Sequence, residues 1–211
     1  MVSRLIQKRT AKIKDHVGGS LLHFFLDSFK NEQGIGMTKL VLTSPTTLTF
    51  GKKEYRCATG AGGFKETKVE GDKATPVGVF GLRYIFYRPD KLEYKPSQRL
   101  TCRALNKNDG WCDDPKDPRY NNHVRLPYPG NHEVLWREDD IYDIIVVTTH
   151  NSMPVIPNNG SAIFIHVARD DYAPTQGCIA LSKDDLLEIL MQAVPSSQII
   201  IPNLETKKKR A

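Results

Sequence analysis

The stretch Ile163–Leu181, IFIHVARDDYAPTQGCIAL, carries the strongest structural and chemical signal in this 211-residue chain. It begins inside Ser161–Val167, an apolar run rich in β-branched and aromatic side chains that predicts a buried central strand. His166 lies near the end of this strand, and Cys178 follows twelve residues later, directly after Gly177. A thiol attacks as its thiolate and needs a base nearby, so this Cys–His pair predicts a cysteine nucleophile.

Gly177 adds a second chemical feature to the segment. Glycine adopts backbone angles that are closed to other residues, so Gly177 can direct its own N–H and that of Cys178 at a developing oxyanion. One such donor stabilises a transition state by about 3–4 kcal/mol. Cys178 and His166 alone also fit an inert buried thiol and a core histidine. These residues by themselves therefore leave catalysis and a structural role both open.

Short predicted strands flank this stretch along most of the chain. Turn signals such as Ser44-Pro45 and Gly51-Lys52 separate runs of β-branched and aromatic residues. The predicted strands are Lys39–Thr43, Thr47–Phe50, Glu54–Ala58, Val77–Tyr87 (one strand or two), Ile141–His150 and Ser197–Pro202.

One helix is predicted shortly after Cys178. Ser182 and Asp185 form a capping box at its start, and Pro195 ends it. The apolar stripe between them consists of Leu186, Leu187, Leu190, Met191 and Val194. The sequence thus predicts a mainly β fold with one packed helix after the cysteine.

The polar segment Arg88–Glu138 contains six prolines and is longer than an ordinary connection, which predicts an irregular, lid-like insertion. Within it, the acidic cluster Asp109–Asp117 lies near Cys102, Cys112 and His123, a combination that suggests a metal site. The spacing matches neither zinc nor calcium motifs. We therefore expect a turn-rich loop with solvated carboxylates and no metal or cofactor. Cys102 and Cys112 either close a short disulfide loop or remain free thiols.

The basic charge belongs to the ends of the chain. The net charge is +6, of which residues 1–36 contribute +3 and residues 205–211 another +3. Residues 37–204 are therefore neutral, which predicts one domain between a basic N-terminal extension and a basic C-terminal tail. A neutral domain has no surface suited to tracking phosphates, so nucleic-acid binding is not expected.

The N-terminal extension does not have the pattern of a secretory signal. His23 and Asp27 interrupt the apolar cluster around Leu21–Leu26, and no small-residue cleavage motif follows. Nor does any run reach the length of a membrane-spanning helix, so no integral membrane segment is expected. On these grounds alone, the sequence indicates the cytoplasm.

Three separated motifs have a familiar order. His166 precedes Thr175-Gln176-Gly177-Cys178, a His followed by Ser/Thr-x-Gly-Cys. Upstream, Thr59-Gly60 precedes Thr75-Pro76-Val77-Gly78-Val79-Phe80, a Thr-Gly followed by Thr-Pro-x-Gly-x-Phe. Over about residues 38–202 this pattern resembles the YkuD-type L,D-transpeptidases. The segments Asp109–Asp114 and Leu135–Asp139 resemble a compact proteobacterial branch of that family.

The resemblance implies a β-sandwich-like catalytic domain that acts on peptidoglycan stem peptides or muropeptides. Cys178 would be acylated by the L-centre of meso-diaminopimelate preceding a terminal D-alanine, His166 would manage the proton, and Gly177 would serve the oxyanion. On the substrate side, the predicted residues are Thr175, Arg169, His150 and Gly60. His150 fits either the cleft lining or a strand-end cap. Carbapenem-type inhibitors and a periplasmic or envelope location are further implications.

The chain also departs from the family pattern. Val167 stands where a glycine often follows the histidine, and Ala180 where an arginine often follows the cysteine. Arg169 is a candidate to replace that arginine, and a solvated surface charge is the alternative.

Three functions fit the sequence. An amine acceptor would make the protein a cross-linking acyltransferase, whereas water would make it an L,D-carboxypeptidase that trims tetrapeptides. The lack of an export signal favours the carboxypeptidase, because recycled muropeptides reach the cytoplasm. The third possibility is a catalytically silent muropeptide-binding module with a structural Cys178, which the intact Thr-x-Gly-Cys motif argues against.

Overall fold

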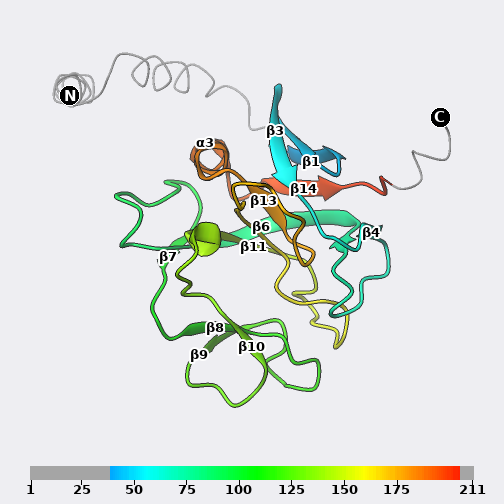
Figure 1. Ribbon diagram of the computed structural model, residues 1–211, viewed down its shortest axis with the longest axis vertical. Coiled ribbons are helices and arrows are strands. Elements are labelled where there is room, and N and C mark those ends of the chain that lie inside the picture. The colour runs from blue at the N-terminus through cyan, green and yellow to red at the C-terminus, as the bar shows by residue number, and fades with distance from the viewer. Residues whose placement is uncertain (1–38, 205–211) are drawn as a thin grey trace. The chain divides into compact units, whose positions relative to one another are not determined.

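The computed structural model describes residues 39–204, which are built mainly from β-strands (Figure 1). The mainly β class expected from the sequence is therefore confirmed. The predicted basic extension 1–36 and basic tail 205–211 lie outside the described residues. Within residues 39–204, no helix combines the length and apolarity needed to span a bilayer.

Eight strands form the main body of the domain. They are β1 (Lys39–Ser44), β2 (Thr47–Phe50), β3 (Lys53–Ala58), β6 (Gly78–Tyr87), β11 (Ile144–Thr148), β12 (Phe164–Val167), β13 (Ile179–Leu181) and β14 (Gln198–Ile201). Two shorter strands, β4 (Phe64–Lys65) and β5 (Thr75–Pro76), pair with each other in parallel.

These strands form the two sheets of a sandwich, and β3 and β6 belong to both sheets. One sheet runs β3-β2-β1-β14-β6, and the other runs β6-β11-β12-β13-β3. The long strand β6 pairs with β14 through Gly78–Gly81 and with β11 through Leu82–Tyr87. An irregularity in register accompanies this change of partner, as is common where a strand bends from one sheet to another. The hydrogen-bonded order therefore closes around one core.

The core joins both sheets to the single helix. Leu40 and Leu48 from the first sheet pack in one buried cluster with Ile85 and Ile165 from the second and with Ile189 of the helix. Burial of each such side chain contributes about 1.5–3 kcal/mol. The strands β12 and β13, which flank the segment between His166 and Cys178, thus pack against this shared core.

The helix, α3 (Lys183–Gln192), begins as predicted at Ser182, whose Oγ accepts a hydrogen bond from the Asp185 N–H at 3.1 Å. Its buried side differs from the predicted stripe. Ile189 is buried, whereas Met191 is 47% exposed. A helical period of 3.6 residues places Met191 away from the face that Leu186 and Ile189 share. The prediction that Met191 belongs to the buried stripe was therefore wrong.

Two further boundaries differ from the expectation. The predicted strand Ile141–His150 consists of a 3-10 turn, η1 (Asp140–Tyr142), followed by the shorter β11. Cys178 does not directly precede the helix, because β13 lies between them. A three-residue strand is too short to show a period of two in the sequence.

The insertion 88–138 is more ordered than its prolines suggested. Its strands are β7 (Cys102–Ala104), which pairs with β6, and β8 (Asp109–Cys112), β9 (His123–Arg125) and β10 (His132–Val134), which form a three-stranded sheet (Figure 1). Trp111 is fully buried, and its Nε1 donates to Asn121 Oδ1 at 3.0 Å.

The carboxylates of this insertion are not all solvated, contrary to expectation. Asp109 is buried, and its Oδ1 lies 2.8 Å from both His123 Nε2 and Arg125 NH1. Asp109 is thus held by two basic side chains of the neighbouring strand β9. Within residues 39–204 no group of three or more His, Cys, Asp or Glu side chains is arranged to hold a metal. Cys102 and Cys112 are free thiols, as are the other two cysteines.

Candidate active site

Parallel pairing of β12 and β13 brings the predicted histidine and cysteine into one region. His166 on β12 is in register with Ala180 on β13, and Cys178 precedes that strand by one residue. Both His166 and Cys178 line a cavity of about 640 Å³. They are 7% and 8% exposed, so each is nearly buried but reaches the cavity surface.

The Cys178 thiol is held by backbone groups of the neighbouring strand segment. Its Sγ donates to the Ala162 carbonyl at 3.0 Å and accepts from the Phe164 N–H at 3.4 Å. Burial raises the pKa of Cys178 to about 12, and the nearby Glu133 charge acts in the same direction. Cys178 is therefore a neutral thiol at neutral pH.

His166 is fixed in the tautomer that suits a general base. Its Nδ1 lies 2.9 Å from the Val167 carbonyl oxygen. Because that oxygen can only accept, Nδ1 carries the proton and Nε2 presents a lone pair. Burial lowers the pKa of His166 to about 4, so the ring is neutral at neutral pH. The Val167 backbone carbonyl thus sets the orientation of the imidazole ring.

The two residues line the same cavity but are not hydrogen-bonded to each other. Within residues 39–204, the hydrogen bonds of the Cys178 sulfur go to Ala162 and Phe164 and none goes to His166. The site at rest holds a neutral thiol and a neutral imidazole.

Gly177 is required by the backbone of the loop. Its φ is +127°, and a Cβ at this position would lie 2.7 Å from the Ala74 carbonyl oxygen. The Gly177 N–H donates to Thr175 Oγ1 at 3.1 Å, and that hydroxyl donates to the Cys178 carbonyl at 2.6 Å. The Gly177 N–H is thus directed at Thr175 and not into the cavity, which differs from the expected oxyanion geometry. Thr175 holds the loop and also lines the cavity.

The upstream Thr-Gly motif supports the same loop. The Thr175 N–H donates to the Thr59 carbonyl and the Ala61 N–H donates to the Thr175 carbonyl, both at 2.9 Å. Gly60 lies against the loop, since a Cβ there would come within 2.9 Å of the Gly177 Cα. The Gly60 N–H donates to the buried Thr75 hydroxyl at 2.8 Å. The motifs separated in sequence therefore meet behind Cys178.

This assembly of motifs agrees with a comparison of the sequence with known families. A family model described as the L,D-transpeptidase catalytic domain, YkuD, matches residues 41–201. The chain belongs to this family. The resemblance that the sequence suggested is therefore confirmed. Members use a cysteine for L,D-transpeptidase-type catalysis on peptidoglycan.

A solved structure provides a second comparison. The chain is similar to the crystal structure of Mycobacterium tuberculosis L,D-transpeptidase 1, at 13% sequence identity and a TM-score of 0.38. The similarity covers 79% of this chain and 59% of that one, so the chain spans about three-fifths of the solved chain's length. A search of curated proteins found no match.

Two residues predicted on the substrate side of this L,D-transpeptidase domain do not line the cavity. Gly60 lies behind the loop, as described above. His150 directs Nε2 to the Asn159 carbonyl at 3.0 Å and packs edge-on against Phe80. Of its two predicted roles, the structure favours the strand-end cap. Arg169 and Thr175 do line the cavity.

Four further polar residues of the cavity, three charged and one a tyrosine, were missed by the sequence analysis. Glu133 and Arg137 come from the insertion, Lys68 comes from the segment after β4, and Tyr142 comes from η1. Arg137 belongs to the Leu135–Asp139 segment, whose resemblance to a family branch was the one sequence signal that could have placed it near the site. Arg137 and Arg169 both act to lower the pKa of His166. They are the two guanidinium groups at a cavity where Ala180 replaces the arginine common in the family.

Proposed function

We propose that the chain cleaves the bond between the L-centre of meso-diaminopimelate and the terminal D-alanine of stem peptides, through a thioester on Cys178. The thioester is then resolved by an amine or by water. The observation that carries the proposal is a cavity lined by both a thiol and a histidine whose Nε2 is held as an acceptor. This arrangement supports acyl transfer by a neutral Cys–His pair.

In the acylation step, His166 Nε2 accepts the thiol proton as the sulfur attacks the peptide carbonyl. A carbon–sulfur bond forms, and the carbonyl oxygen becomes an oxyanion. Collapse of this intermediate breaks the carbon–nitrogen bond, and His166 returns the proton to the departing D-alanine amine. Within residues 39–204 the Cys178 N–H has no hydrogen-bond partner, so it is the proposed donor to the oxyanion.

In the second step, His166 accepts a proton from the attacking amine or water. The new carbon–nitrogen or carbon–oxygen bond forms as the carbon–sulfur bond breaks, and the proton restores the Cys178 thiol. Transpeptidase and carboxypeptidase activity thus share one acyl-enzyme and differ only in the acceptor.

The test is incubation of the full chain with a purified tetrapeptide muropeptide, with and without an amine acceptor, followed by mass analysis of protein and products. We expect a Cys178 adduct and release of D-alanine, and neither with Cys178→Ala. Cross-linked product would identify a transpeptidase, whereas tripeptide alone would identify a carboxypeptidase. Substantial turnover by folded Cys178→Ala would end the covalent mechanism. Binding without an adduct would favour a silent binding module.

A further inference from the structure

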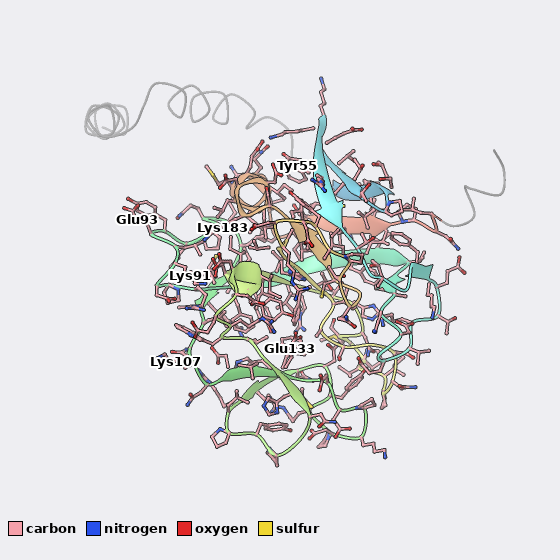
Figure 2. The ribbon with its side chains drawn as sticks, viewed as in Figure 1. Tyr55, Lys91, Glu93, Lys107, Glu133 and Lys183 are labelled. Atoms are coloured by element: carbon pink, nitrogen blue, oxygen red, sulfur yellow. The ribbon has the colours of Figure 1, made fainter. Side chains whose placement is uncertain are left out.

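Glu133 on β10 brings a carboxylate from the insertion into the cavity that holds Cys178 and His166. Figure 2 shows it between the three-stranded sheet and the main strands. The side chain is partly buried, and its charge is one of the two that act on the Cys178 thiol, the other being that of Lys68. No step of the proposed reaction uses Glu133.

Only one of the two oxygens of this carboxylate has a hydrogen-bond partner within residues 39–204. The Tyr142 hydroxyl donates to Glu133 Oε1 at 2.7 Å, and the Tyr142 ring packs edge-on against His166 with 5.4 Å between ring centroids. Within residues 39–204, Glu133 has no other side-chain hydrogen bond and no ion pair. Its second oxygen therefore retains the capacity to bind a ligand.

Two of the cations that line the cavity are already engaged in ion pairs. Arg137 pairs with both Asp139 oxygens at 2.7 Å, and Lys68 forms a buried ion pair with Asp72. Neither Asp72 nor Asp139 lines the cavity. The lining instead holds carboxylates that have no ion pair within residues 39–204, and Glu133 is the one whose charge acts on the Cys178 thiol.

A second carboxylate in the lining points the same way. One oxygen of Asp113 is buried and has no hydrogen-bond partner among the described residues. Burial raises the pKa of Glu133, and the charges of Asp113 and Glu70, which also line the cavity, act in the same direction. Unpaired carboxylates in a confined space are costly, and a cation that enters the space relieves this cost.

We propose that Glu133 is a specificity-determining residue that binds a primary ammonium group of the stem peptide beside Cys178. This inference rests on the proposed function. The ammonium would neutralise a charge that opposes formation of the thiolate, so binding of the correct substrate would also make Cys178 easier to deprotonate. Both the acyl donor and the acyl acceptor of an L,D-transpeptidase can carry such an amine.

The first experiment measures the cavity charge without any peptidoglycan substrate. Cys178 in the full chain is labelled with a cationic and an anionic methanethiosulfonate, and the ratio of the two rates is determined by peptide mass mapping. Glu133→Gln keeps an oxygen acceptor for the Tyr142 hydroxyl but removes the charge. We expect the cation-to-anion ratio to fall about 10-fold in this variant.

Glu138→Gln is the matched control, because it removes the same charge from an exposed position on the same segment. We expect this control to change the ratio less than about 2-fold. Tyr142→Phe removes the hydroxyl but keeps the ring and the charge, and it should retain the wild-type preference for the cation. An unchanged ratio in folded Glu133→Gln would overturn the inference.

The second experiment compares a tetrapeptide that has a free side-chain amine with the same peptide N-acetylated there. Acylation of Cys178 is followed by intact-protein mass without an acceptor, and aminolysis is then started by adding an amine. If the donor supplies the ammonium, wild type acylates the free amine about 10-fold faster and Glu133→Gln loses this preference. If the acceptor supplies it, Glu133→Gln slows only aminolysis.

The two proposals fail in different ways. Equal acylation and aminolysis in wild type and Glu133→Gln would refute ammonium binding while leaving acyl transfer intact. Absence of an acyl-enzyme with every peptide would refute the proposed function, and the labelling ratio would still decide whether Glu133 attracts cations to Cys178.

Discussion

Replacing His166 should make the folded domain less sensitive to acid. Burial lowers the pKa of His166 to about 4, whereas a histidine in an unfolded chain titrates near about 6.5. Between these values the unfolded chain binds a proton that the folded domain excludes. Above about pH 6.5 the titration of His166 therefore leaves the free energy of unfolding unchanged. As the pH falls towards 4, the protonation of His166 in the unfolded chain lowers that free energy.

The gap between the two pKa values corresponds to a loss of about 3 kcal/mol between pH 7.5 and pH 4. Urea unfolding of wild type and His166→Gln at both pH values measures this quantity as a double difference. Glutamine has a similar size and can still donate to the Val167 carbonyl. Other titrating groups, including His150, whose pKa is also lowered by burial, cancel in the comparison.

We expect wild type to lose about 3 kcal/mol more than the variant on acidification. Equal losses would show that His166 titrates alike in folded and unfolded chains, and the neutral pair would have to be abandoned. The same pKa predicts that the acid limb of kcat/KM falls near pH 4, because this ratio reports the free enzyme. His166→Gln should also lower the acylation rate by about 10²–10⁴-fold.

Three other perturbations probe the site and its surroundings. Gly177→Ala should lower the free energy of unfolding by about 1–3 kcal/mol, because the φ of +127° and the Ala74 carbonyl oppose a Cβ; unchanged urea stability would contradict this. A carbapenem should add one mass to wild type and none to Cys178→Ala by intact-protein mass spectrometry, and equal labelling would implicate another cysteine. A chain of residues 37–204 should fold and turn over muropeptide as the full chain does. Inactivity of that folded chain would assign a role to the basic ends.

Strands and the helix were predictable where the signal is local. Runs such as Thr47–Phe50 and the cap at Ser182 are set by neighbouring residues, and the structure places both elements as expected. The strand β13 was missed because its three residues are too few to show alternation. Pairing between distant strands was not predictable, because register is set by packing and not by composition.

The sequence predicted the candidate catalytic pair but not most of the residues that line the cavity. The motif around Cys178 and His166 predicted two reactive groups, and the structure places both residues at one cavity. Glu133 and Arg137 reach that cavity because the insertion folds into a small sheet of its own, and no local pattern indicates where such a sheet lies. Nor does a local pattern indicate that the Ala162 carbonyl accepts a hydrogen bond from the Cys178 thiol, because the two residues meet through long-range packing.

The pKa values do not distinguish Cys178, the proposed nucleophile, from the other three cysteines. Burial raises the pKa of Cys57 to about 12, as it does for Cys178, and it also raises the pKa values of Cys102 and Cys112. Cys178 differs from the other three in its surroundings, since it shares a cavity with a histidine held as an acceptor and directly follows a glycine with a φ of +127°. A thiol that stays protonated at rest resists alkylation and oxidation, because both proceed through the thiolate. Its reactivity would then depend on the substrate, which must draw the sulfur away from Ala162 and reduce the opposing charge at Glu133.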